Sequence, residues 1–228
     1  MGETPRSVLM VHGGGGGGWE WAVWRSVFEA ARLQVEAPDL QPSSRGLALT
    51  GFADYAAQVR AALTALPRPR AVVGASLGGL LAAACADAAD AVVLVNPLPP
   101  APWHAQLPGR DWPDVVPWQR DARLTGTRRA LPDADEATAL FAFRHWRDES
   151  GLAMREAHAG IAVARPGCRV LCIASMVDDN VPPALTAALA SDWGASLLRA
   201  QAVSHVGPLL GRGAADCAAQ ALAWLSAQ

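Results

Sequence analysis

The sequence contains no lysine, so all 19 of its basic residues are arginine. This absence excludes chemistry through a lysine Schiff base, and it excludes the phosphate-binding loop whose lysine contacts nucleotide phosphates. Charge of either sign is also scarce, with a net charge of −2 and a pI near 6.2. That balance gives no electrostatic basis for binding nucleic acid or an anionic membrane. We expect a small-molecule substrate, with neither nucleic acid nor a membrane as a partner, and the oligomeric state stays open.

Cysteines and long apolar runs are also few. The chain has four cysteines, with no C-x-x-C pair and no histidine–cysteine spacing typical of zinc, so we expect no metal, no cofactor and a reducing, cytoplasmic setting. No apolar stretch approaches the length of a membrane span. The segment Met1–Arg6 precedes only a short apolar run and lacks the long apolar region of a signal peptide. The cysteines are Cys85, Cys168, Cys172 and Cys217.

Short apolar, β-branched runs alternate with longer segments rich in alanine and leucine. This alternation predicts an α/β fold, with a mostly parallel six-stranded sheet that is covered by helices on both faces. The expected strands are continuously apolar, as parallel strands buried on both faces should be. They are Val8–Val11, Gln34–Ala37, Ala71–Gly74, Ala91–Val95, Arg169–Ala174 and Ser196–Ala200. The expected helices between and after them are Trp21–Leu33, Phe52–Leu66, Leu77–Ala86, one from Pro183 and Ala214–Ser226.

Residues 97–167 interrupt this alternation. The segment begins rich in proline, carries three tryptophans in a loop-like stretch, and then shows helical patterns over Ala134–Arg147 and Leu152–Ala164. A long excursion between two sheet strands is usually functional. We therefore expect residues 1–96 and 168–228 to form the core domain and residues 97–167 to form an inserted, largely helical cap.

The strongest motif is Gly74–Gly79, which contains a G-x-S-x-G pattern around Ser76. It lies between an apolar strand and an alanine-rich helix, which is the setting of a nucleophile elbow. Such a turn strains the serine backbone and requires small residues two positions away, where strand and helix approach. A chance match in a glycine-rich chain is the alternative, and the correct flanks disfavour it.

A serine hydroxyl needs a base, because it is a weak nucleophile at neutral pH. Of the five histidines, His205 follows the last strand and precedes the last helix, so it is expected at the same sheet edge as Ser76. The acid that orients it should follow a late strand. Asp178 and Asp179 both follow the fifth strand, whereas the fourth strand ends in Asn96 and offers no carboxylate. His104, His145 and His158 lie in the insertion and are expected to be surface or packing residues.

A run of six glycines, Gly13–Gly18, follows His12 at the end of the first strand. Glycines there allow backbone N–H groups to approach an oxyanion, and the N–H of Leu77 is the expected second donor. A dinucleotide-binding interpretation competes, because six glycines satisfy G-x-G-x-x-G automatically and Asp39 ends the next strand. The bulky tryptophans at the helix entry disfavour it.

Together these motifs resemble the α/β-hydrolase superfamily over nearly the whole chain. The resemblance comprises the histidine–glycine loop, G-x-S-x-G, Asp-x-x-Val-Pro and Ser-His, each after the appropriate strand. It implies Asp178 rather than Asp179 as the triad acid, and Gly14 as the other oxyanion donor. The usual N-terminal hairpin is missing, Ala75 replaces a common histidine, and Ser175 stands where glycine is frequent. The compact esterase and hydroxynitrile-lyase-like branch is the most similar.

The expected function is hydrolysis of a carboxylic ester, thioester or lactone through an acyl-enzyme on Ser76. We expect a small apolar or aromatic substrate, contacted by Trp103, Trp112 and His12. Two alternatives stay open. One is C–C bond hydrolysis or a lyase reaction by the same triad, although a lyase route through a cap lysine is closed. The other is a non-catalytic ligand-binding protein on this fold.

Overall fold

The computed structural model describes residues 4–227, so residues 1–3 and 228 of the predicted core lie outside the described part. Six parallel strands form the main sheet in the order β2-β1-β3-β4-β7-β8. The predicted fold class is thereby confirmed, and each strand lies within two residues of its predicted bounds. The strands are β1 (Ser7–Val11), β2 (Gln34–Glu36), β3 (Arg70–Ala75), β4 (Ala91–Val95), β7 (Arg169–Ser175) and β8 (Ser196–Ala200).

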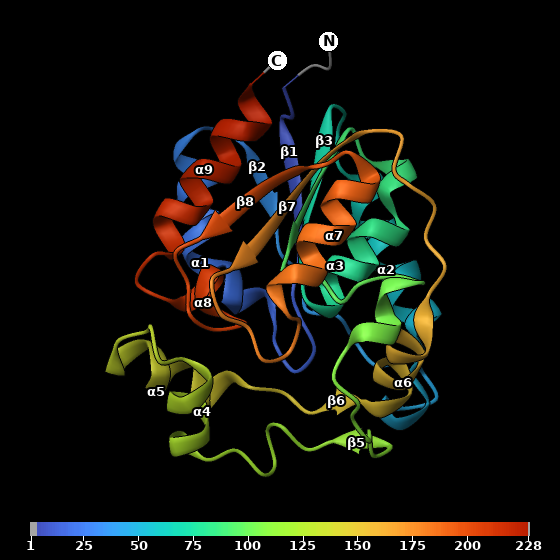
Figure 1. Cartoon of the computed structure of the whole chain (residues 1–228), viewed down its shortest axis with the longest axis vertical. Coiled ribbons are helices and arrows are strands. Elements are labelled where there is room, and N and C mark those ends of the chain that lie inside the picture. Colours follow the sequence, from blue (N-terminus) through green and yellow to red (C-terminus); the bar gives the residue numbers. More distant parts are fainter. Residues whose placement is uncertain (1–3, 228) are drawn as a thin grey trace.

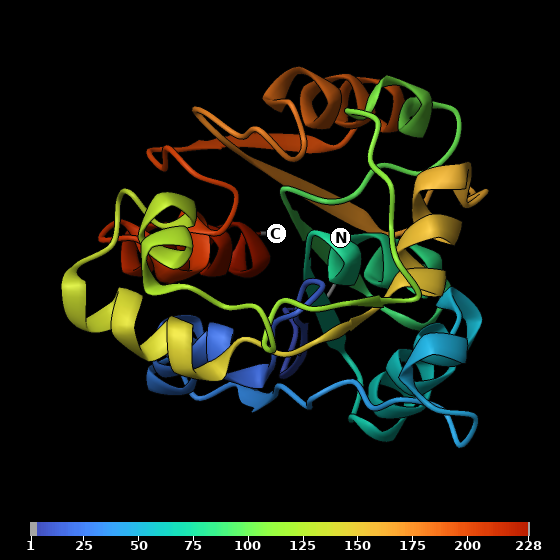
Figure 2. The ribbon, with the colours of Figure 1, turned by 90° about the horizontal axis from the view of Figure 1, so that it is seen from below.

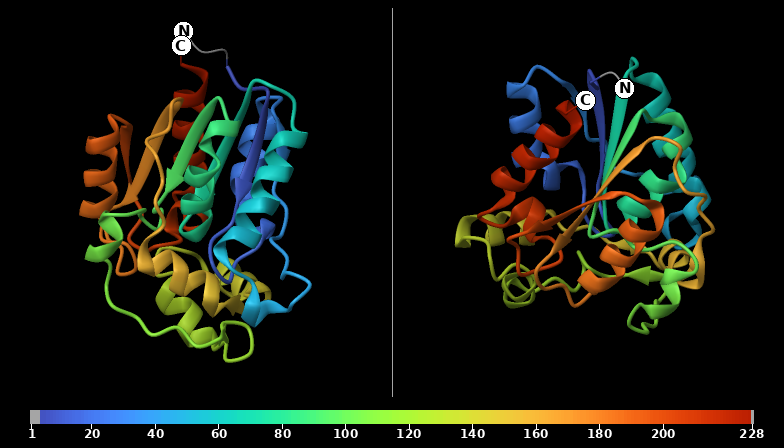
Figure 3. Two further views of the ribbon diagram at one scale, coloured as in Figure 1. Left: turned by 90° about the vertical axis from the view of Figure 1, so that its right-hand side faces the viewer. Right: turned by 45° about the horizontal axis from the view of Figure 1, so that its top comes forward.

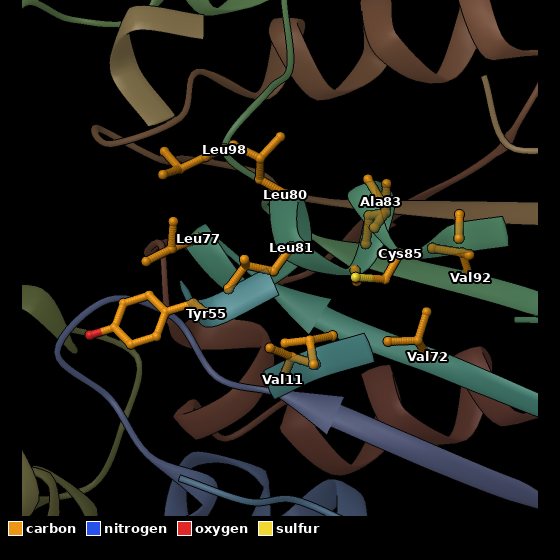
Figure 4. Packing of buried hydrophobic residues seen from close by; sticks show 14 of the residues in the cluster. Val11, Tyr55, Val72, Leu77, Leu80, Leu81, Ala83, Cys85, Val92 and Leu98 are labelled. Carbon is orange, nitrogen blue, oxygen red and sulfur yellow. The ribbon is translucent and has the colours of Figure 1, made fainter. Parts of the chain in front are cut away.

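Helices cover both faces of the sheet (Figures 1 and 3). On one face, α1 (Ala22–Ala30) packs against α9 (Ala214–Ser226); the other carries α2 (Phe52–Ala65), α3 (Leu77–Ala84) and α7 (Pro183–Trp193). Successive residues of a strand point to opposite faces, so Val72 joins the core beneath α2 and α3, while Val73 joins the core beneath α1 and α9. Figure 4 shows the first of these cores, in which Val72 and Val92 belong to the same cluster as Leu80 and Leu81.

The insertion, residues 97–167, lies beyond the carboxyl ends of the strands (Figure 1). Viewed from below, it crosses this edge of the sheet, with α5 on the side of α1 and α6 on the side of α2 (Figure 2). It contains two predicted helices, a third that the sequence did not indicate, and a small antiparallel pair. These elements are α4 (Leu124–Ala130), α5 (Glu136–His145), α6 (Gly151–Gly160), β5 (Val115–Val116) and β6 (Glu149–Ser150).

Short helical turns complete the chain. The 3-10 turns are Gly18–Trp21, Leu47–Leu49, Ala86–Ala88 and Trp103–Gln106, and α8 (Gly207–Leu210) follows His205 directly. The start of β1 and the end of α9 lie near one another at the edge of the sheet opposite the insertion (Figure 1). Within residues 4–227, no helix has the length and apolar character needed to span a bilayer.

Candidate active site

Ser76 sits in the tight turn between β3 and α3, with backbone angles φ 53° and ψ −120°. Non-glycine residues rarely adopt positive φ, so the surrounding contacts must hold the strain. A Cβ atom added to Gly74 would lie 2.1 Å from the carbonyl oxygen of Gly78, and one added to Gly78 would lie 2.3 Å from that of His12. The glycines are therefore required by close backbone approach, as predicted for a nucleophile elbow.

The carboxylate beside His205 is that of Asp178. Its Oδ2 accepts a hydrogen bond from His205 Nδ1 at 2.6 Å, and its side chain is fully buried. Oδ1 accepts from the backbone N–H groups of Asn180 and Val181, at 2.8 and 3.0 Å. Asp179, in contrast, is exposed. The turn thus fixes both oxygens of Asp178 and leaves Nε2 of the imidazole as the free acceptor.

Ser76 and His205 line the same cavity. No direct hydrogen bond joins their side chains in the described part of the chain. Ser–His contacts in ligand-free hydrolases are often longer than in their complexes, so the arrangement is compatible with proton transfer. The α3 N-terminus lies behind Ser76 and favours negative charge that develops there.

Two side chains that were not predicted as site residues hold the His205 loop. Asn96, at φ 41°, donates to the backbone oxygen of His205 at 2.7 Å and to Ser175 Oγ at 2.8 Å. Asp133, from the insertion, accepts from Ser204 Oγ at 2.8 Å and from the N–H of Val203 at 3.0 Å. A polar residue at the end of β4 was a visible signal for Asn96, whereas no sequence pattern links Asp133 to a loop 70 residues away.

The predicted oxyanion donors are the N–H groups of Leu77, directly after Ser76, and of Gly14 in the glycine run. A Cβ added to Gly13 would lie 3.1 Å from Ser76 Cβ, which brings the start of the glycine run against the nucleophile. Gly14 also lines the cavity. Among the described residues, the N–H groups of Gly14 and Leu77 donate to no protein acceptor, so both are available to a ligand oxygen.

Two carboxylates shape the glycine run itself. The N–H of Gly18 donates to Asp39 Oδ1 at 2.8 Å, and the N–H of Gly15 donates to Glu149 Oε2 at 3.0 Å. The Tyr55 hydroxyl, which points out of the apolar cluster in Figure 4, donates to Glu149 Oε1 at 2.7 Å. Burial and the neighbouring Glu149 raise the pKa of Tyr55. Asp39 thus closes the loop by binding its backbone, a structural role that explains its position without a ribose.

The cavity has a volume of about 550 Å³, and its walls are mainly apolar and aromatic. Trp112, one of the tryptophans expected to contact substrate, lines it together with Trp118, and the two rings lie 5.9 Å apart at 82°. His158 also faces it, although histidines of the insertion were expected to pack or face solvent. Its ring is 5.1 Å from that of Trp112, and burial and Arg110 lower its pKa. The other apolar lining residues include Leu98, Val116, Pro117, Trp146, Met154, Val206 and Leu209.

Two residues expected to contact the substrate, His12 and Trp103, do not line this cavity. His12 Nε2 accepts from the N–H of Leu40 at 2.9 Å, so its Nδ1 carries the proton and donates to the carbonyl of Gly13 at 2.8 Å. Burial lowers its pKa, which favours this neutral form. His12 therefore braces the start of the glycine run. Trp103 packs instead against the core beneath α2 and α3, because the 3-10 turn that carries it lies beside α6.

Glu20 is a further lining residue that the sequence did not single out. It is buried, with 3% of its surface exposed, and no hydrogen-bond partner reaches its Oε2 atom. Burial raises its pKa to about 8, although the backbone amides of Gly13 and Gly17 act in the opposite direction. This side chain therefore carries a proton at neutral pH.

The raised pKa of Glu20 has a consequence for stability. Between about pH 4.5 and 8 the unfolded chain releases this proton and the folded chain keeps it, so folding stability falls as the pH rises through this window. Glu20→Gln removes this dependence on pH. We expect the free energy of unfolding of Glu20→Gln, relative to that of wild type, to be at least about 1 kcal/mol higher at pH 8 than at pH 4.5, since each pKa unit corresponds to ~1.4 kcal/mol. Urea unfolding at both pH values measures this, with exposed Glu36→Gln as the control. An equal effect at both pH values would contradict the raised pKa.

No group of three or more histidine, cysteine, aspartate or glutamate side chains within residues 4–227 is arranged to hold a metal ion. The chemistry that this arrangement can perform is nucleophilic attack by a serine oxygen, with an imidazole as base and backbone amides as the oxyanion site.

The comparisons with known proteins agree with the fold. Solved structures with the same fold include polyneuridine aldehyde esterase, at 16% identity and a TM-score of 0.74 over 95% of this chain and 98% of that one. A methylesterase from Arabidopsis shares 14% identity, with a TM-score of 0.72 over 96% and 98%, and a pyrethroid hydrolase shares 18%, with 0.72 over 97% of both chains. No curated protein matches the sequence. The family model described as "Alpha/beta hydrolase family" matches residues 8–220, so the chain belongs to the α/β-hydrolase family.

Proposed function

We propose that the protein is a serine hydrolase that cleaves a carboxylic ester of a small, apolar or aromatic substrate through an acyl-enzyme on Ser76. The observation that carries the proposal is the convergence of the strained Ser76 turn and the Asp178–His205 pair on one cavity. The structural neighbours named as esterases and as a pyrethroid hydrolase add support from the fold. The size and apolar walls of the cavity support a small-molecule substrate. Four free cysteines support a reducing, cytoplasmic setting.

The reaction follows from the contacts of each group. His205 Nε2 takes the proton of Ser76 as its oxygen attacks the ester carbonyl, and Asp178 stabilises the imidazolium that forms. The N–H groups of Leu77 and Gly14 receive the oxyanion of the tetrahedral intermediate. The imidazolium then returns the proton to the leaving alcohol. Water, deprotonated by His205, hydrolyses the acyl-enzyme and restores Ser76.

Attack by Ser76 is tested by labelling with a fluorophosphonate, which modifies an activated serine. We expect wild type to be labelled and to hydrolyse p-nitrophenyl esters. Ser76→Ala should lose labelling and at least about 10⁴-fold in kcat, because the nucleophile is removed while the oxyanion site remains. Ser26→Ala, on the outer surface of α1, is the matched control. Folded wild type that resists labelling would overturn the proposal and favour a non-catalytic binding role.

One other reaction class has a specific observation behind it. The tomato methylketone synthase I has the same fold, at 14% identity and a TM-score of 0.75 over 96% of this chain and 97% of that one. One fold can host more than one chemistry, so C–C bond hydrolysis or a lyase reaction by the same triad is our second candidate. A panel of esters, thioesters, lactones and β-keto compounds separates the two by their products, because ester-type hydrolysis breaks a C–O or C–S bond, whereas C–C cleavage of a β-keto compound releases a ketone in place of the alcohol or thiol.

A further inference from the structure

The cavity contains an ionisable group that the proposed mechanism does not use. Glu20 lies in the 3-10 turn Gly18–Trp21, immediately after the glycine run, and lines the cavity together with Ser76. A buried carboxyl in a pocket of apolar walls is costly unless it has a partner or stays neutral. The burial of the Glu20 carboxyl in this cavity therefore needs a physical explanation.

The Glu20 side chain folds back against the glycine run. A Cβ added to Gly16 would lie 1.9 Å from its Oε2 and 2.8 Å from its Oε1, so a side chain at this position would displace the carboxyl from where it lies. Gly16 and Gly13 belong to one tight turn, in which the N–H of Gly16 donates to the carbonyl of Gly13 at 3.2 Å. Gly13 in turn contacts Ser76. The carboxyl therefore lies one loop turn from the nucleophile.

No cation neutralises this carboxyl within the described chain. None of the ion pairs of residues 4–227 involves Glu20, and Oε2 is buried without a hydrogen-bond partner. On the outer side of the run, Arg147 is shared between Asp39 and the carbonyl of Leu40. The remaining ionisable groups that line the cavity are Arg110, Asp121, Arg123, His158 and His205, and no hydrogen bond joins any of them to Glu20.

The backbone amides of Gly13 and Gly17 act on the Glu20 carboxyl, but its Oε2 atom is buried without a hydrogen-bond partner. Because the carboxyl carries a proton at neutral pH, its O–H group is an unused donor. Donation to a ligand would satisfy it, because an unpaired buried polar group costs about 1–3 kcal/mol and a partner removes that cost. Apolar sites that keep a carboxylic acid neutral use it as a hydrogen-bond donor in this way.

We propose that Glu20 is a substrate-binding residue that donates its carboxyl O–H to a second oxygen of the substrate, next to the reacting carbonyl. The substrate class is then an ester with a keto, hydroxyl or alkoxy oxygen close to the scissile bond. The N–H groups of Leu77 and Gly14 remain for the carbonyl oxygen itself. This inference rests on the proposed serine hydrolysis, and it adds a polar requirement to an otherwise apolar site.

The test compares ethyl butanoate with ethyl 2-hydroxybutanoate and ethyl 3-oxobutanoate in wild type, Glu20→Gln and Glu20→Met. Gln keeps a donor of nearly the same shape that does not ionise, whereas Met keeps the length and removes the donor. We expect wild type at pH 6.5 to favour at least one oxygenated ester by about tenfold or more in kcat/KM, because a site built to bind an oxygen discriminates against analogues that lack it. Glu20→Met should lose this preference and Glu20→Gln should retain most of it.

The pH dependence provides a second readout. In wild type the preference should decline as the pH rises through about 8, because Glu20 loses its donor proton, and in Glu20→Gln it should not change with pH. The comparison of pH profiles between wild type and Glu20→Gln holds even when Glu20→Met does not fold. Glu36→Gln, on an exposed strand position, is the control.

Labelling of Ser76 by a fluorophosphonate separates the two proposals. If wild type is not labelled, the serine hydrolase proposal fails first. Suppose instead that wild type is labelled and hydrolyses esters, but the relative rates for the three esters are the same in wild type and in both Glu20 variants. The Glu20 proposal is then overturned, and the carboxyl serves only to support the glycine run. A preference that is lost in Glu20→Met and independent of pH in Glu20→Gln supports it.

Discussion

Asp178→Asn is expected to reduce kcat/KM by about 10⁴-fold, with little change in fold. Oδ1 of Asp178 accepts from two backbone N–H groups, those of Asn180 and Val181. In the variant the amide oxygen will keep these two bonds, which turns the NH₂ group toward His205. Nδ1 must then become an acceptor, so the proton moves to Nε2, where the ring no longer accepts a proton from Ser76.

The neighbouring Asp179 provides the matched control. It is exposed and adjacent in sequence, so Asp179→Asn changes the local charge equally but touches neither the ring nor the turn amides. We expect it to stay within about threefold of wild type, as surface substitutions usually do. Steady-state kinetics on one p-nitrophenyl ester, with circular dichroism to verify folding, measures both. A larger loss in Asp179→Asn would show that the acid has been assigned to the wrong residue.

The second large effect is expected on stability, from Gly78→Ala. An added methyl group would lie 2.3 Å from the backbone oxygens of both Val11 and His12. Backbone atoms of a central strand do not move aside as a flexible side chain does, so α3 must shift away from β1. We expect a loss of about 3 kcal/mol or more, at the upper end of overpacking effects. At roughly 2–4 °C per kcal/mol for a chain of this size, Tm should fall by about 10 °C.

Gly109→Ala is the control for this substitution. No atom lies within 4 Å of a Cβ added at Gly109, which is in a loop of the insertion. Its Tm should therefore change by less than about 2 °C. Thermal unfolding followed by circular dichroism measures both variants. If Gly78→Ala matched this control, the close approach of α3 to the end of β1 would not be what requires glycine in the motif.

The sheet-edge positions of Ser76, His205 and Asp178 were accessible from sequence because each depends on local order along the chain. A parallel sheet brings the carboxyl ends of its strands to one edge. A motif that directly follows an apolar strand is therefore placed at that edge without knowledge of side-chain contacts. This reasoning identified Ser76 and His205, and the family spacing selected Asp178, which the geometry now places 2.6 Å from the ring.

The wall of the cavity was predicted less well. Trp103 and Trp112 are equally placed beside prolines in sequence, but only Trp112 lines the cavity. His158 packs against Trp112, as expected of a histidine in the insertion, but it also lines the cavity, which the sequence did not indicate. The insertion has no long repeating pattern, so the direction of each side chain depends on how α6 docks against α2. That docking is a contact between segments about 100 residues apart.

The sequence alone determined the fold class, the parallel sheet and the order of the chemical groups, because apolar periodicity and turn residues act over a few neighbouring positions. Only the tertiary structure decided what surrounds those groups. Asn96 and Asp133 hold the His205 loop, His12 braces the glycine run, and Glu20 lies buried in the cavity wall with its Oε2 atom unpartnered. Each of these features depends on the distances between remote segments and on the exclusion of water. Burial and neighbouring groups set the charge of a carboxyl, and no local sequence pattern encodes them.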